Sequence, residues 1–284
     1  MQDSEIFITG ANGQIGTALR QIYPNSKSAD IDELNITDKN SVLDFDWTQT
    51  KVLINAAGYT NVDGAQTPEG EKTAFAVNDQ AVGYLARAAK QNNLTLVHVS
   101  TAYVFDGAKK IYTEEDEPNP LGVYAKSKLA GDKKAAATSK HYIVRTDSVI
   151  GEGKNFVRTM LELGKKGVPP TVVSDQYIRP AFTTELAQAI NHLLTANCPF
   201  GIYNLTNEGK PISWADFTRA IFKEANINLK VTDTTLAKYS AGKEGVAPRP
   251  LNSVLDLAKI EATGFTPHDW YEDLMDYINK ELGR

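Results

Sequence analysis

The stretch EIFITGANGQIG (5–16) decides the fold, because it joins a short apolar run to a glycine-rich turn. The apolar run is typical of a buried strand, and QIGTALRQIY (14–23) has apolar residues at helical spacing. Gly10, Gly13 and Gly16 lie at this strand–helix junction. Glycines there let a phosphate approach the backbone and the positive end of a helix. A glycine turn without a ligand is the alternative, but its place between strand and helix favours a dinucleotide-binding turn.

The strand–helix rhythm continues through the first half of the chain. Further apolar runs at 51–58, 93–100 and 141–151 predict strands, and helical patterns separate them. Uninterrupted apolar runs indicate burial on both faces. The sequence therefore predicts an α/β fold of Rossmann type, with a doubly wound parallel sheet.

The rhythm is lost after Gly151, where loops lengthen and elements become irregular. We predict a dinucleotide-binding domain at 1–150 and a smaller α/β substrate-binding lobe at 151–284. The helical pattern at 180–196 is expected to pack back on the first domain.

Bulk composition excludes several classes of function. The chain has 284 residues, 42% hydrophobic and 23% charged, with a net charge of −5, so nucleic acid is not an expected partner. Its four histidines lack ligand spacing, so no metal site is expected. One cysteine, no signal-peptide pattern and no apolar run near the roughly 18 residues of a membrane span predict a cytoplasmic protein.

Asp30 bears on the choice of cofactor. It follows Gly10 by twenty residues, where a carboxylate accepts hydrogen bonds from the adenosine ribose. A negative charge would repel the 2′-phosphate of NADPH, which favours NADH, although Lys27 lies close enough to weaken that preference. The cofactor is predicted to be NADH or NADPH.

Three polar residues predict proton-transfer chemistry. Thr101 ends the predicted strand at 93–100, and Tyr124 and Lys128 lie one helical turn apart in LGVYAKSKLAGD (121–132). Ligands of open α/β sheets bind at the carboxyl ends of strands. A neighbouring ammonium is expected to lower the pKa of the tyrosine, and a hydroxyl can donate to a carbonyl oxygen. Separately each has an ordinary structural explanation, but together with the glycine turn they indicate an active site.

These motifs resemble the extended short-chain dehydrogenase/reductase superfamily, and within it the dTDP-4-dehydrorhamnose reductase family. The resemblance rests on TGANGQIG, NAAG (55–58), VSTAYVFDG, Tyr124 with Lys128, and late segments such as PRPLNS. It covers nearly the whole chain. It implies reduction of a 4-keto-6-deoxy sugar nucleotide, and a homodimer is common in the superfamily.

The resemblance also implies which residues bind ligands. The implied cofactor-binding residues are Gly10, Asn12, Gly13, Gln14, Ile15, Gly16, Asp30, Ala56, Ala57, Gly58, Tyr124 and Lys128. The implied substrate-binding residues are Thr101, Ala102, Tyr103 and Arg249, the last beside the pyrophosphate.

Three departures from the family pattern fall in the substrate region. Ala102 stands where the family has aspartate, and Asp147 with Ser148 where it has Ser-Trp. Ile178 and Ala181 interrupt a third motif. A 4,6-dehydratase is excluded because Ala102 and Tyr103 replace its Asp-Glu pair. Two alternatives stay open: an epimerase with tightly held NAD, and a non-catalytic regulatory subunit like that of methionine adenosyltransferase.

Overall fold

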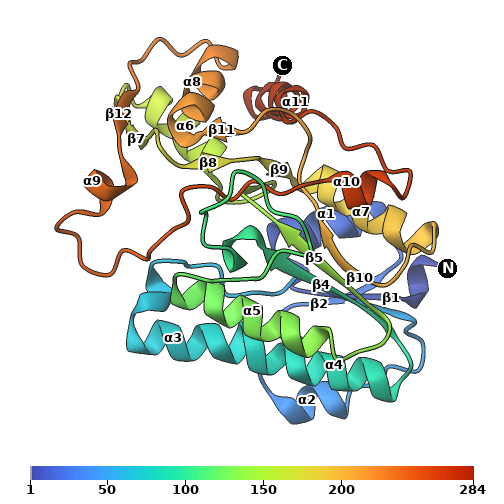
Figure 1. The fold of residues 1–284 in the computed structure, drawn as a ribbon. Helices are drawn as coiled ribbons and strands as arrows, with labels where there is room; N and C mark the ends of the chain where they lie inside the picture. Colours follow the sequence, from blue (N-terminus) through green and yellow to red (C-terminus); the bar gives the residue numbers. More distant parts are fainter. Residues whose placement is uncertain (1) are drawn as a thin grey trace.

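The computed structural model describes residues 2–284 and is built on a central six-stranded sheet (Figure 1). The strand order is β10-β5-β4-β3-β1-β2, and the paired strands are parallel. The strands are β1 (Ile6–Thr9), β2 (Lys27–Ala29), β3 (Val52–Asn55), β4 (Thr95–Thr101), β5 (His141–Thr146) and β10 (Gly201–Asn204).

Helices cover both faces of this sheet. Strand β1 shows why, since Ile6 and Ile8 pack in one apolar cluster and Phe7 in another on the opposite face. One face carries α1 (Gln14–Ile22) and α7 (Thr183–Thr195). The other carries α2 (Lys39–Leu43), α3 (Pro68–Phe75), α4 (Ala81–Gln91) and α5 (Val123–Ala135). The predicted doubly wound Rossmann-type fold is confirmed.

A smaller lobe lies above the sheet in Figure 1 and has its own apolar core. Aliphatic and aromatic side chains share this core, and the rings of Phe156 and Phe217 stack 5.9 Å apart. Its helices are α6 (Phe156–Lys165), α8 (Trp214–Glu224), α9 (Leu236–Ser240) and α11 (Trp270–Leu282). Its short strands pair as β7 (Thr171–Val173) with β12 (Thr232–Thr234), and β8 (Tyr177–Ile178) with β11 (Ile212–Ser213).

The chain crosses between lobe and sheet more than once. Strand β6 (Val149–Ile150) pairs with β9 (Ala181–Phe182), which leads directly into α7. Strand β10 then joins the sheet edge beside β5, and α10 (Ala258–Glu261) contacts it. The division of the chain at residue 150 stays a prediction. Strand β10, which lies in the range assigned to the lobe, completes the sheet.

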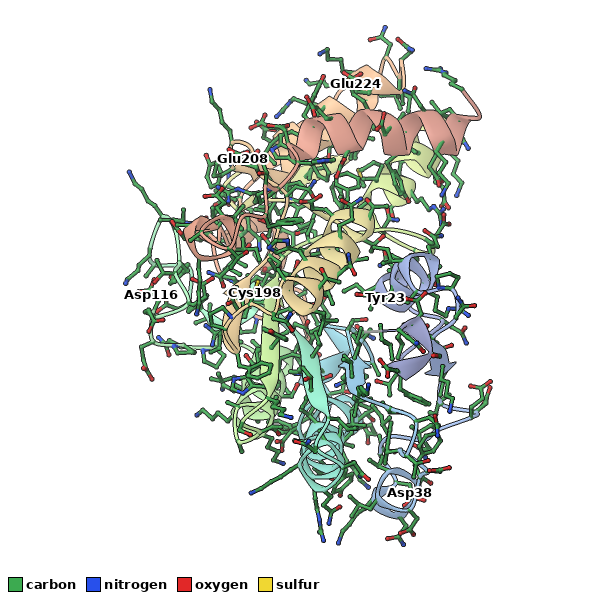
Figure 2. The ribbon with its side chains drawn as sticks, turned by 90° about the vertical axis from the view of Figure 1, so that its right-hand side faces the viewer. Tyr23, Asp38, Asp116, Cys198, Glu208 and Glu224 are labelled. Atoms are coloured by element: carbon green, nitrogen blue, oxygen red, sulfur yellow. The ribbon has the colours of Figure 1, made fainter. Side chains whose placement is uncertain are left out.

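A polar contact links α1 to α7. The hydroxyl of Tyr23, the C-cap of α1, donates to the side chain of Asn191 at 3.0 Å. Figure 2 shows Tyr23 beside α7, with Asp38 and Glu224 at opposite ends of the molecule. Within residues 2–284, none of the helices is long and apolar enough to cross a membrane.

Candidate active site

The glycine turn is held by close backbone packing. Gly10 has a φ of +69°, a left-handed conformation that favours glycine. A Cβ on Gly10 would lie 2.5 Å from the backbone nitrogen of Ala57, and one on Gly16 would lie 2.1 Å from the carbonyl oxygen of Gly10. Both positions therefore need glycine for packing.

Gly13 has a different environment. A Cβ there would meet only the carbonyl oxygen of Gly10, at 3.3 Å. Gly13 is the N-cap of α1 and provides no side-chain cap. The first N–H groups of α1, together with the positive end of the helix dipole, can therefore bind an anion.

A cleft of about 620 Å³ opens beside this turn. Its lining includes most of the residues predicted to bind cofactor: Gly10, Asn12, Gly13, Gln14, Ile15, Asp30, Ala56, Ala57 and Gly58. Gly16 packs behind the turn. The Gln14 side-chain oxygen is buried without a hydrogen-bond partner in the described chain, so a ligand donor can use it. The helix end, the glycine turn and this free acceptor fit a dinucleotide.

Asp30 follows β2 and lines the same cleft. One carboxylate oxygen accepts the backbone N–H of Asn12 at 3.0 Å, and the other accepts that of Ile31 at 2.8 Å. These bonds fix the carboxylate at the cleft wall. Its bonding to the cofactor ribose stays a prediction.

The structure brings Thr101, Tyr124 and Lys128 together. Thr101 is the last residue of β4, and the other two lie in the first two turns of α5. All three line a cavity of about 110 Å³, which shares Ile15 and Gly58 with the cofactor cleft. The cavity therefore lies where one end of a bound dinucleotide would meet a substrate.

The protonation of the pair differs from the expectation. Burial raises the pKa of Tyr124 to about 12, and the opposing effect of the Thr101 hydroxyl is smaller. Burial also lowers the pKa of Lys128 to about 8. The prediction that Lys128 lowers the tyrosine pKa is therefore wrong for this structure, because loss of hydration dominates. Tyr124 is a protonated phenol at neutral pH.

Lys128 is anchored below the cavity. Its Nζ donates to the backbone carbonyl of Val99 in β4 at 2.6 Å. The same atom would be 4.0 Å from a Cβ on Gly58, so it also borders the loop after β3, which lines the cofactor cleft. Asp132, one turn further along α5, is buried beside Arg145, with 3.6 Å between carboxylate oxygen and Nε. Lys128 thus links the cofactor cleft to the catalytic cavity.

The two residues after Thr101 point to different environments. The Tyr103 ring meets that of Tyr124 edge-on at 6.4 Å, and its hydroxyl accepts a hydrogen bond from Gln176 at 3.4 Å. Ala102 is fully buried and packs with Val104. Its predicted contact with substrate is therefore wrong, because the short helix after β4 turns this side chain into the core.

Arg249 is already engaged within the chain. Its guanidinium forms an ion pair with Asp63 at 2.8 Å and donates to the carbonyl of Ala247 at 3.1 Å. The pair joins the PRPLNS segment to the loop after β3. A role for Arg249 at the substrate pyrophosphate stays a prediction.

Sequence reasoning assigned no role to two residues that shape the site. Asn78 is buried. Its side chain accepts the backbone N–H of Tyr59 and donates to the Tyr59 carbonyl and to the Ser127 hydroxyl, which fixes the loop after β3 on α5. Asp147 lines the catalytic cavity beside Tyr124. A charged residue inside the predicted strand at 141–151 was the available signal for Asp147.

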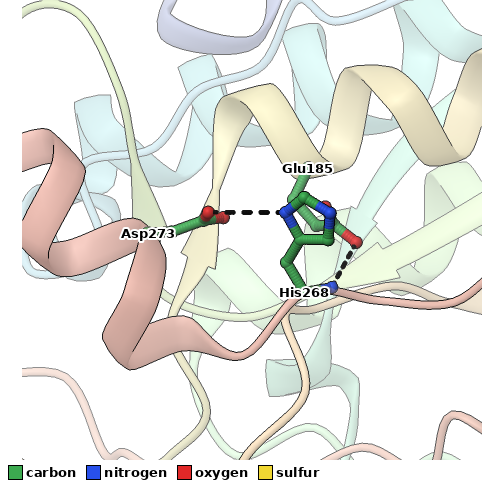
Figure 3. Close-up of side chains that lie close together, drawn as sticks. All are labelled: Glu185, His268 and Asp273. Carbon is green, nitrogen blue, oxygen red and sulfur yellow. Dashed lines mark hydrogen bonds and ion pairs between the residues drawn. The ribbon is translucent and has the colours of Figure 1, made fainter.

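A second polar cluster lies at a separate cavity of about 350 Å³. Glu185, His268 and Asp273 come from different segments, and one potential ligand atom of each lies within 4.8 Å of the others (Figure 3). The backbone N–H of His268 donates to the Glu185 carboxylate at 3.1 Å. The ring Nδ1 of His268 lies 3.7 Å from the Asp273 carboxylate. These contacts tie α7 to α11. Sequence spacing gave no sign of the cluster, and the absence of a metal stays a prediction.

Curated relatives match this chain along most of its length. The dTDP-4-dehydrorhamnose reductase of Aggregatibacter actinomycetemcomitans is 39% identical, over 95% of this chain and 97% of that protein. The spore coat polysaccharide biosynthesis protein SpsK of Bacillus subtilis is 34% identical, over 98% of each.

Solved structures agree with this similarity. A dTDP-4-dehydrorhamnose reductase from Clostridium acetobutylicum superposes with a TM-score of 0.90 at 36% identity, covering 98% of this chain and 99% of that one. The Bacillus anthracis enzyme of that name, in complex with NADP, gives 0.88 at 31% identity, covering 97% and 98%. The family model described as "RmlD substrate binding domain" matches residues 4–282. The chain therefore belongs to the RmlD substrate binding domain family.

Proposed function

We propose that this chain is an NAD(P)H-dependent reductase of a 4-keto-6-deoxy sugar nucleotide. The proposed substrate is dTDP-4-dehydro-L-rhamnose and the product dTDP-L-rhamnose. The observation that carries the proposal is the grouping of Thr101, Tyr124 and Lys128 in a cavity that shares lining residues with the dinucleotide cleft. Relatives that carry the reductase name over nearly their whole length support it.

We assign one task to each of the three residues. A reduced nicotinamide bound in the cleft supplies the hydride. Tyr124, protonated at neutral pH, donates its phenolic proton to the oxygen at C4 as that oxygen gains negative charge. Thr101 donates a hydrogen bond to the same oxygen and orients the carbonyl. Lys128 binds the nicotinamide ribose, because it lies between Gly58 of the cofactor cleft and the catalytic cavity.

The same proposal covers the partner, the cofactor, the localisation and the oligomeric state. The partner is a small sugar nucleotide, and the cofactor is NADH or NADPH. We expect the protein to act in the cytoplasm, and a homodimer stays a prediction.

The testing experiment follows absorbance of the reduced nicotinamide after dTDP-4-dehydro-L-rhamnose is added to enzyme with NADH or NADPH. Stoichiometric oxidation of either cofactor is the expected result. Asp30→Ala should raise the Kd of NADH more than that of NADPH, because the carboxylate faces a free ribose hydroxyl only in NADH. Cofactor binding without oxidation would contradict the reductase assignment, and equal losses for both cofactors would remove Asp30 from the ribose.

A further inference from the structure

Asp147 occupies an unusual place for a carboxylate. It directly follows β5, which lies beside β4 at the centre of the sheet (Figure 1). Its side chain lines the small cavity with Thr101 and Tyr124, and the residue is only 8% exposed. A carboxylate so far from bulk water needs specific partners.

Within residues 2–284, only one of its two oxygens has hydrogen bonds of ordinary length. Oδ2 accepts the hydroxyl of Ser253 at 2.8 Å and the backbone N–H of Arg179 at 3.2 Å. Oδ1 accepts the Ser148 hydroxyl at 3.4 Å, which is long for a bond between oxygens, and the backbone N–H of Ser148 also helps to lower the pKa of this carboxyl. Segments from the lobe therefore hold the carboxylate in place while one oxygen keeps acceptor capacity.

Nearby cations are engaged elsewhere. The Arg179 guanidinium donates to the carbonyl of Leu255 at 3.0 Å, and Lys128 donates to Val99. Burial raises the pKa of Asp147 to about 7, and its charge contributes to the raised pKa of Tyr124. Within residues 2–284 the Asp147 carboxylate forms no ion pair, although Arg179 is close enough for the two charges to interact.

A purely structural role would be to anchor the Ser253 segment to the sheet. The Oδ2 contacts alone would satisfy that role. They do not explain an under-used acceptor in the wall of a catalytic cavity. A donor supplied by a ligand would complete its hydrogen bonding, and the reacting sugar is the ligand that enters there.

We propose that Asp147 is a specificity residue whose Oδ1 accepts a hydrogen bond from the sugar hydroxyl at C3, next to the carbonyl that is reduced. The inference rests on the proposed function. Asp147 shares the cavity wall with Thr101 and Tyr124, which act on the C4 oxygen, and the hydroxyl adjacent to C4 is the one at C3 because C5 carries a methyl group. A site built to bind a hydroxyl discriminates strongly against an analogue that lacks it.

The test compares kcat/KM on dTDP-4-dehydro-L-rhamnose and on its 3-deoxy analogue, for wild type, Asp147→Ala and Asp147→Asn. On the hydroxylated substrate at pH 8, above the Asp147 pKa of about 7, Asp147→Ala should lose about 10- to 100-fold, the range for hydrogen bonds to a charged group. On the 3-deoxy analogue it should lose less than about threefold, because no bond is removed. Equal losses on both substrates, or no loss on either, would overturn the proposal.

Asp147→Asn separates anchoring from recognition. The amide can keep the Ser253 and Arg179 contacts, so a merely structural residue would tolerate it on both substrates. We expect a loss confined to the hydroxylated one. Glu114→Gln is the matched control, because Glu114 is a buried carboxyl that accepts the Asn204 N–H at 2.8 Å outside this cavity. It should not alter the ratio between the two substrates.

Calorimetry of dTDP-L-rhamnose and its 3-deoxy analogue distinguishes this proposal from the function on which it rests. Selective weakening of the hydroxylated ligand in Asp147→Ala supports the contact even without turnover. Equal affinity of Asp147→Ala and wild type for dTDP-L-rhamnose overturns the contact and leaves the reductase intact if wild type turns over. Failure of wild type to bind or reduce either sugar nucleotide overturns the proposed function, and the contact with it.

Discussion

Tyr124 keeps its phenolic proton at neutral pH because its surroundings disfavour a buried phenolate. The direction of this pKa shift suits a reductase, since the alkoxide formed from a carbonyl is a far stronger base than a phenolate. Lys128 is the group whose charge changes near physiological pH, because burial lowers its pKa to about 8. At neutral pH, Tyr124 therefore carries the proton to be transferred, and Lys128 is the residue whose charge depends on pH.

Replacing Tyr124 with phenylalanine tests the proton donor. The ring and its packing remain while the hydroxyl is lost, so kcat should fall by about 10²–10⁴, the usual contribution of one acid–base group. NADPH binding, followed by fluorescence titration, should stay near the wild-type value. A kcat loss below about tenfold would remove Tyr124 as the acid.

At the scale of elements, the turn between β1 and α1 separates two uses of glycine. Gly16 has no room for a Cβ because the carbonyl oxygen of Gly10 is too close. Gly13 has nearly enough room but lies in the wall of the cofactor cleft. One position thus serves packing, and the other serves approach of the ligand.

Alanine substitutions should reveal this division. Gly16→Ala must displace the turn, so we expect about 1–3 kcal/mol of lost stability together with weaker cofactor binding. Gly13→Ala should weaken binding with a smaller change in stability. Thermal unfolding and NADPH titration of both variants provide the check, and similar unfolding midpoints would contradict the packing role of Gly16.

At the scale of the whole molecule, α7 connects sheet and lobe. It packs on α1 in the sheet domain, and its first turn carries Glu185, which accepts the N–H of His268 ahead of α11. Burial raises the pKa of Glu185 to about 7 from an ordinary value of 4.5. The folded protein therefore holds this proton more tightly than the unfolded chain between those values, and stability falls as pH rises through that window.

Glu185→Gln removes this titration and should make the protein relatively more stable at high pH. The difference in unfolding midpoint between variant and wild type should grow by a few degrees from pH 5 to pH 8. Glu162→Gln, at an exposed position on α6, is the control and should show a constant difference. The same behaviour in both variants would rule out Glu185 as the source of the pH dependence.

The sequence by itself determined those features that depend on spacing along the chain. The glycine turn, the first four long strands of the sheet and the pairing of Tyr124 with Lys128 all follow from strand and helix periodicity. Backbone geometry fixes these relations locally, so they need no knowledge of distant residues.

Only the tertiary structure decided which distant residues meet and how deeply they are buried. It moved Ala102 into the core, paired Asp147 with Ser253 across 106 positions and Arg249 with Asp63 across 186, and added β10 to the sheet edge. It also reversed the expected pKa shift of Tyr124. The physical reason is the same in each case. Desolvation and contacts between distant residues depend on how the elements pack in space, and the periodicity of residues along the chain does not determine that packing.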